Sequence, residues 1–311
     1  MLTIQTADQQ RFANLLLTIG VAHLWLTEHA TATARFEECI ALARTIHDRG
    51  LECKALARLG RIGLEQGRFE QAEKHLQEGL AIARQLNDID MIAYTMAHLG
   101  YISHYQGRYA DAQAYGEESY EYAKQTGDAI AQAFSLNMLA MVSVNNHQYE
   151  QGHAYHLQAI EICKHAGDRY GLARAYSNLS ELIRIQRKYA EAKPYTVEGI
   201  KLTRELGNRY ALPIMLINLV YSQVGLGEIR DAYASLRSAL QLNIENDSVS
   251  WILFSLVGYA NILAAEGKRK SALQILGFCM SHPETNSDTH RDIQLVLEDV
   301  KKVRSDDIEE E

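Results

Sequence analysis

The sequence contains very little proline: only three of its 311 residues, Pro194, Pro213 and Pro283. Proline removes a backbone donor and clashes inside a helix, so a chain with so few is open to long helices. Runs of β-branched residues, which are typical of strands, are also scarce. These two shortages predict an all-α protein.

Cysteine is scarce too, and the four residues form no motif. Cys39, Cys53, Cys163 and Cys279 contain no CxxC pair and no Cys/His spacing of a zinc site. They lie in apolar helical patterns, where a free cysteine behaves as a small hydrophobe. The N-terminus lacks the pattern of a signal peptide, and the apolar segment 12–26 is too short to span a membrane. We therefore expect a cytoplasmic protein with no membrane contact.

Positive charge is in deficit, because the formal net charge is −8 and the pI is near 5.9. A nucleic-acid binder normally carries a basic face, so we expect no direct contact with nucleic acid. Much of the negative charge lies in the segment 304–311, which we predict to be an acidic disordered tail. An acidic docking segment is the alternative.

Motifs for catalysis are missing. The chain has no GxxxxGK[ST], GxGxxG, HExxH or GxSxG. His153 and His156 lie three residues apart without a third ligand, and we interpret them as a solvated surface pair, because metal sites need three or four ligands. The prediction is a protein without cofactor, metal or catalytic residues. An enzyme with a diffuse site is the weakest reading.

What the chain does have is an internal repeat of 40 residues. GRFEQAEKHLQEGLAIARQLND (67–88) returns as GRYADAQAYGEESYEYAKQTGD (107–128). Steps of 40 from Ala72 reach Ala112, Gly152, Ala192, Ala232 and Ala272, and similar columns start at Leu59 and at the turn residue Gly67. We predict a lead-in at 1–12, seven repeats at 13–52, 53–92, 93–132, 133–172, 173–212, 213–252 and 253–292, and a capping helix at 288–303.

Each repeat is expected to hold two helices, near 53–66 and 69–86 in the second repeat. A closing column is expected to stop one helix and cap the next: Asp48, Asp88, Asp128, Asp168 and Asn208. We expect the small residue Gly60 to lie where Ala72 packs, because two helices approach closely only where side chains are short.

The order Leu59-Gly60, Ala72, Leu76 resembles the tetratricopeptide repeat, and this resemblance covers 13–292. It implies a right-handed α-solenoid of about seven helix pairs. The period is 40 rather than the usual 34, and the proline that commonly ends the second helix is missing. The 40-residue type, with GDRYGLARAYSNLSEL at 167–182, is similar to sensor regions of bacterial STAND-class signal-transduction ATPases. That likeness implies an upstream ATPase domain in the same polypeptide.

The inner face of each first helix is apolar and aromatic where an ordinary amphipathic helix is charged. The resemblance implies that this face lines a concave groove, and Arg and aromatic residues supply most binding hot spots. An equally simple alternative is that the face packs against neighbouring helices. The candidate groove residues are Arg58, Arg61, Tyr94, His98, Tyr101, Phe134, Asn137, Met141, Arg174, Asn178, Glu181, Asn218 and Tyr221.

These patterns predict a non-catalytic sensor that binds a peptide, a small effector or a partner segment and regulates signalling or transcription. A stand-alone scaffold is the alternative. The chaperone-tail adaptor is disfavoured, because the lysine that its carboxylate clamp needs is replaced by Ala57, Ala97, Asn137, Ser177 and Ile217.

Overall fold

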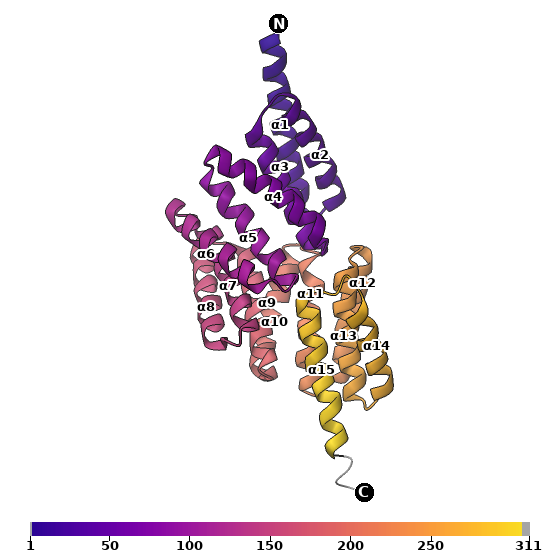
Figure 1. Cartoon of the computed structure of the whole chain (residues 1–311). Helices are drawn as coiled ribbons and strands as arrows, with labels where there is room; N and C mark the ends of the chain where they lie inside the picture. Colours follow the sequence, from indigo (N-terminus) through magenta and orange to yellow (C-terminus); the bar gives the residue numbers. More distant parts are fainter. Residues whose placement is uncertain (1, 307–311) are drawn as a thin grey trace. The chain divides into compact units, whose positions relative to one another are not determined.

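The computed structural model describes the backbone of residues 2–306 and the side chains of residues 7–301. The predicted tail at 304–311 lies largely outside that part. The described chain is all-α, as predicted, and its helices pack in sequential pairs (Figure 1). The helices are α1 Leu2–Trp25, α2 His29–Thr45, α3 Arg49–Gln66, α4 Phe69–Leu86, α5 Ile89–Tyr105, α6 Tyr109–Thr126, α7 Ala129–Asn145, α8 Tyr149–Ala166, α9 Arg169–Ile185, α10 Tyr189–Glu205, α11 Ala211–Gly225, α12 Ile229–Glu245, α13 Val249–Ala265, α14 Arg269–Ser281 and α15 Ser287–Asp306.

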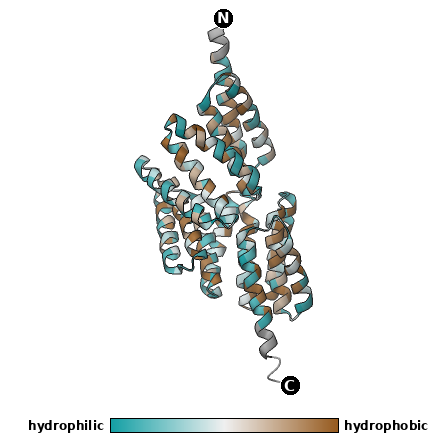
Figure 2. Ribbon diagram, viewed as in Figure 1, coloured by the Kyte–Doolittle hydropathy of each residue, from teal (hydrophilic) through white to brown (hydrophobic). Residues whose placement is uncertain are grey.

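The chain divides into two compact units. The first holds residues 1–104 and 108–171, and the second holds 105–107 and 172–311. Within the first unit α1 packs on α2, α2 on α3, α3 on α4, and α6 and α8 pack on α7. Within the second unit α10 to α14 pack in the same sequential way, and α15 lies against α13 and α14. In each unit apolar residues concentrate where helices meet (Figure 2).

The turns repeat with a period of half a repeat. Every twentieth residue from Thr27 to Gly267 has a positive φ between 51° and 76°. The backbone at these positions is left-handed, which ends one helix and reverses the chain. Glycine fills seven of the positions, but His147 takes the same conformation at φ 59°. The predicted turn column is therefore the row of left-handed residues that ends each first helix.

The predicted caps are confirmed. Asp48 Oδ1 accepts the backbone N–H of Leu51 over 3.0 Å, so α3 begins at Arg49, four residues before the expected start. The side-chain oxygens of Asp88, Asp128, Asp168 and Asn208 accept equivalent backbone N–H groups over 2.9 to 3.1 Å. One column of the sequence thus satisfies an otherwise unpaired donor at the start of five successive first helices.

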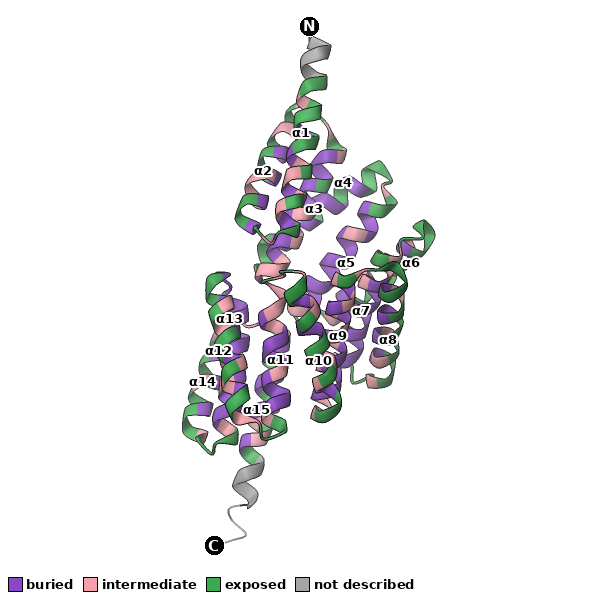
Figure 3. Ribbon diagram, turned by 180° about the vertical axis from the view of Figure 1, so that it is seen from behind, coloured by how far each residue is buried: buried purple, intermediate pink, exposed green. Residues whose placement is uncertain are grey.

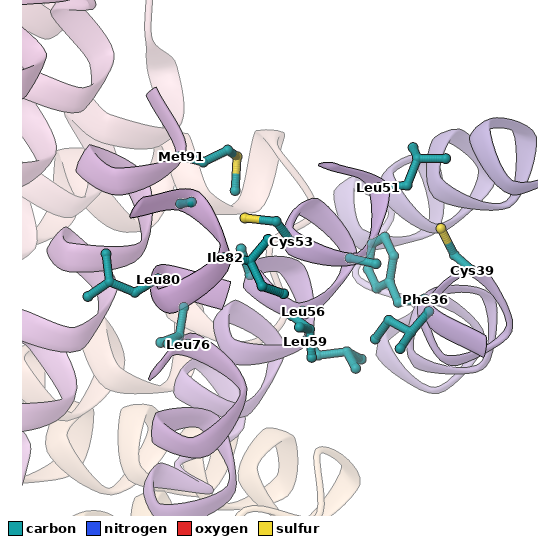
Figure 4. Packing of buried hydrophobic residues seen from close by; sticks show 14 of the residues in the cluster. Phe36, Cys39, Leu51, Cys53, Leu56, Leu59, Leu76, Leu80, Ile82 and Met91 are labelled. Carbon is teal, nitrogen blue, oxygen red and sulfur yellow. The ribbon is translucent and has the colours of Figure 1, made fainter. Parts of the chain in front are cut away.

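The packing of the small residues differs from the prediction. A Cβ on Gly60 would meet the side chain of Leu76, and a Cβ on Gly63 would meet Ala72. The expected pairing of Gly60 with Ala72 is therefore wrong. Gly60 packs against Leu76, one turn after Ala72 on α4, and Ala72 packs against Gly63, one turn after Gly60 on α3. Leu56, Leu59 and Leu76 are buried in the same core of the first unit, next to Phe36 and Cys39 of α2 (Figure 4).

Candidate functional site: the inner faces of the two units

In the first unit the inner residues of α3, α5 and α7 form a continuous row of ring contacts. The guanidinium carbon of Arg58 lies 4.5 Å from the ring centre of Tyr94. Tyr94 contacts His98 at 4.3 Å between centres, and His98 stacks on Phe134 at 4.7 Å. Tyr101 also contacts Phe134, at 4.7 Å between ring centres. The 40-residue period places these side chains in register on successive first helices.

A second row starts at Arg61, one turn after Arg58. Its guanidinium lies 5.2 Å from the ring centre of Trp25, and its Nε donates to Glu65 over 2.8 Å. The other oxygen of Glu65 lies 2.9 Å from Nε2 of His29. Burial acts to raise the pKa of Glu65, but Arg61 and His29 outweigh it and lower that pKa to about 2. Trp25 also contacts Tyr170, 145 residues away, at 4.9 Å.

Buried and exposed positions alternate along the helices of the first unit (Figure 3). The predicted residues of this unit fall into two groups by their burial. His98, Tyr101, Asn137 and Met141 are at most 8% exposed, so they take part in packing. Arg58, Arg61, Tyr94 and Phe134 keep partial exposure and lie together on the rows described above.

Trp25, which is 46% exposed, belongs with these partly exposed residues, but the sequence analysis did not include it among the candidate groove residues. It occupies the thirteenth position of the first repeat, which the helical wheel assigns to the inner face. Reading that wheel through the first repeat would have found it.

His156 is not the solvated surface residue that the sequence predicted. Its side chain is fully buried, and its Nδ1 lies 3.0 Å from Oδ1 of Asn137. Asn137, another predicted groove residue, donates its amide to the carbonyl of Ala133. In the described part of the chain no group of His, Cys, Asp or Glu could hold a metal ion.

In the second unit three predicted residues, Glu181, Asn218 and Tyr221, lie where α15 packs, together with Arg184, which was not among the predicted site residues. Arg184 donates to Asn218 Oδ1 over 2.9 Å and to Asp292 Oδ2 over 2.7 Å, and its guanidinium lies 4.3 Å from the ring centre of Tyr221. Glu181 pairs with Arg291 of α15. Burial raises the pKa of Glu181 against the opposing charge of Arg291.

The two remaining predicted residues of the second unit, Arg174 and Asn178, are half-buried on α9. A pocket of about 470 Å³ also opens between α10, α11 and α12. Val197, Lys201 and Ser235 help to line it, and no predicted residue does.

The cysteines are not poised for chemistry. None of the four forms a disulfide, and all four are buried. Burial raises the pKa of the thiols of Cys39, Cys53 and Cys279 to about 11, so they stay protonated near neutral pH. No helix in the described range is long and apolar enough to cross a membrane.

Comparisons with known proteins agree with this repeat architecture. Residues 11–85 match the family model described as tetratricopeptide repeat. Residues 99–186 and 187–266 match, one after the other, a second model described as anaphase-promoting complex subunit 5. No curated protein sequence matches the chain.

Solved structures share the fold at low sequence identity. The Rap conjugation gene regulator of plasmid pLS20, solved with the Phr* peptide, is 14% identical, with a TM-score of 0.70 over 96% of this chain and 79% of that one. A Rap protein complexed with competence and sporulation factor is 12% identical, with a TM-score of 0.61 over 93% and 99%. A STAND protein with a tetratricopeptide repeat sensor from Pyrococcus horikoshii is 16% identical, with a TM-score of 0.54 over 94% of this chain and 46% of that one.

At these identities the likeness to the solved structures shows the fold alone. It agrees with the 40-residue helix pairs, their capped first helices and the match to the repeat model. This chain therefore belongs to the tetratricopeptide repeat proteins.

Proposed function

We propose that this chain is a non-catalytic, cytoplasmic module that binds an extended peptide on the inner face of its first unit. The observation that carries the proposal is the half-exposed group of Trp25, Arg58, Arg61 and Tyr94, in which two guanidinium groups lie over aromatic rings. Partly exposed aromatic and arginine side chains are the residue types that dominate binding hot spots.

Arg58 is the anchor of this proposal. Its guanidinium lies over Tyr94, and no carboxylate pairs with it among the described residues. Arg61, in contrast, is already neutralised by Glu65 at 2.8 Å. An unpaired, half-buried guanidinium can take a carboxylate with two hydrogen bonds. The preferred ligand is therefore a peptide with an acidic side chain or its own terminal carboxylate at Arg58 and an apolar residue beside Trp25.

Two structural neighbours were solved with a Phr* peptide and with competence and sporulation factor, and this supports peptide binding here. Regulation of signalling or transcription is the role that we propose for such binding. The likeness to the STAND sensor also fits a module that controls an ATPase domain in the same polypeptide. In a stand-alone scaffold, the alternative, the same surface would tether a partner.

The test uses a phage-displayed library of random decapeptides as the probe, with selected peptides measured by calorimetry. We expect acidic and aromatic residues among the selected peptides, and at least a tenfold loss of affinity for Arg58→Ala. Arg84→Ala is the matched control, because Arg84 is exposed on the outer helix α4. Equal affinity of the Arg58→Ala and Arg84→Ala chains would reject the proposed surface.

A further inference from the structure

The helix α15 is attached to the second unit by buried charges. Asp292 is 0% exposed and pairs with Arg184 of α9, which is 3% exposed, over 2.7 Å. Arg291 next to it pairs with Glu181 of α9 and with Asp288 of its own helix, the latter over 2.9 Å. The contact thus joins residues more than 100 positions apart in the sequence.

This contact differs from the apolar packing within a helix pair. α3 and α4, for example, meet through small and aliphatic side chains such as Gly60 and Leu76. A buried ion pair adds little net stability, because desolvation of both charges offsets their attraction. Losing one partner is costly, since the other charge is then left buried and unpaired. The Arg184–Asp292 pair therefore contributes more to the choice of which helix binds here than to the strength of the attachment.

The fit of α15 is also incomplete. Asn218 Nδ2 is buried without a hydrogen-bond partner. Tyr221 is buried beside the carboxylate of Asp292, and Oδ1 of Asp292 lies 3.7 Å from Nε of Arg291. Asn218 and Tyr221 are 1% and 6% exposed, and both line the surface against which Asp292 lies. A buried donor without a partner costs free energy. A helix that supplied an acceptor to Asn218 Nδ2 would gain a hydrogen bond that α15 does not make.

We propose that Glu181, Arg184, Asn218 and Tyr221 form a helix-binding surface, of which α15 is the resident occupant. The partner it fits is an amphipathic helix with an adjacent Arg–Asp pair: the aspartate meets Arg184 and the arginine meets Glu181. Apolar residues one and four positions after the aspartate complete the motif, as Ile293 and Val296 do in α15. This surface lies in the second unit and does not depend on the peptide site proposed for the first.

A partner helix has to compete with α15, which is tethered by the short loop 282–286. A short tether gives an effective concentration in the millimolar range, so the intact chain hides the surface. Cutting the tether removes this advantage and leaves the surface itself unchanged. Pro283 and Glu284 are both exposed in the loop, so a protease recognition sequence can be inserted between them.

The experiment follows exchange of α15 in the cleaved full chain. The probe is a fluorescein-labelled peptide of residues 287–301, and binding is measured by fluorescence anisotropy. We expect the peptide to bind the cleaved chain at least tenfold more tightly than the uncleaved chain. The matched control is the same peptide with Asp292→Asn, which has the same shape without the charge and is expected to bind at least tenfold more weakly.

Three outcomes would overturn the inference. The first is equal binding of the two peptides, because the charge would then play no part in selection. The second is failure of the wild-type peptide to bind the cleaved chain while circular dichroism shows that its helices are intact. The third is formation of dimers on cleavage, seen by light scattering, because the occupant would then be α15 of a second copy. All three use the wild-type surface, so no variant has to be refolded.

Discussion

His156 on α8 and Asn137 on α7 share a hydrogen bond of 3.0 Å in a fully buried position. The amide of Asn137 donates to the carbonyl of Ala133, so its Oδ1 faces His156 as an acceptor. The proton of the neutral imidazole therefore lies on Nδ1, and Nε2 has no hydrogen-bond partner. Burial, and to a smaller extent His153, lower the pKa of His156 to about 3.

This pair predicts a loss of stability in mild acid. Because the folded-state pKa lies below the unfolded value near 6.5, the unfolded chain binds more protons between pH 6.5 and 3. The free energy of unfolding should fall by about 2 kcal/mol from pH 7.5 to 5 through this residue alone. Urea denaturation at both pH values measures this decrease in the free energy of unfolding. In His156→Gln the decrease should be smaller than in wild type by that amount. His165→Gln, at an exposed site on the same helix, should keep the wild-type fall.

The ion pair of Glu65 predicts a second acid-dependent contribution at lower pH. The folded-state pKa of Glu65 is lowered to about 2, so its contribution is present above pH 4.5 and is lost as the pH falls towards 2. Wild type should lose about 1.4 kcal/mol more than Glu65→Gln between pH 7 and 3.5. Denaturant titrations at the two pH values check this. Glu70→Gln, at an exposed position on α4, should lose as much unfolding free energy between these pH values as wild type does. A loss in Glu65→Gln equal to that of wild type would contradict the ion-pair account.

The turn at His147 predicts a stabilising substitution. His147 holds a left-handed backbone at φ 59°, which costs a residue with a Cβ about 1–2 kcal/mol. Glycine avoids this strain but gains entropy when unfolded, so His147→Gly should raise stability by about 0.5 kcal/mol. Gly107→Ala is the mirror experiment, since Gly107 has φ 76° and no atom within 4 Å of an added Cβ. It should lower the melting temperature by strain alone.

The helix contact at Gly60 predicts a large penalty for one methyl group. A Cβ there would overlap the side chain of Leu76, which is fully buried. Overpacking of this kind costs about 1–3 kcal/mol, so Gly60→Ala should lower the free energy of unfolding by that amount. Gly277→Ala is the control, because Gly277 is helical and exposed with open space around it. Alanine should stabilise the helix there, and destabilisation at both sites would show that the packing argument is wrong.

The helices and their caps could be predicted from the sequence because they depend on local contacts. The column from Asp48 to Asn208 caps helices through residues three positions away, and the turn at Gly67 needs only its own backbone. The pairing of Gly60 with Leu76 in place of Ala72 could not be predicted, because it depends on how far one helix slides along another.

The candidate site could be predicted from the sequence only in part. A helical wheel gives the side of a helix on which a residue lies, but it does not show which other elements cover that side. The wheel placed Arg58, Tyr94, Glu181 and Tyr221 on the same inner face. Tertiary packing then left Arg58 and Tyr94 half-exposed in the first unit, whereas α15 covered Glu181 and Tyr221 in the second.

The sequence by itself determined the period, the helix pairs and the capping, since each follows from interactions within about 20 residues. Only the tertiary structure decided that His156 is buried, that Trp25 meets Tyr170 and that Asp292 meets Arg184. Small differences in packing between successive repeats add up along the array, so they decide which distant residues meet. The repeated sequence pattern does not determine these accumulated packing differences, so the contacts between distant residues cannot be predicted from it.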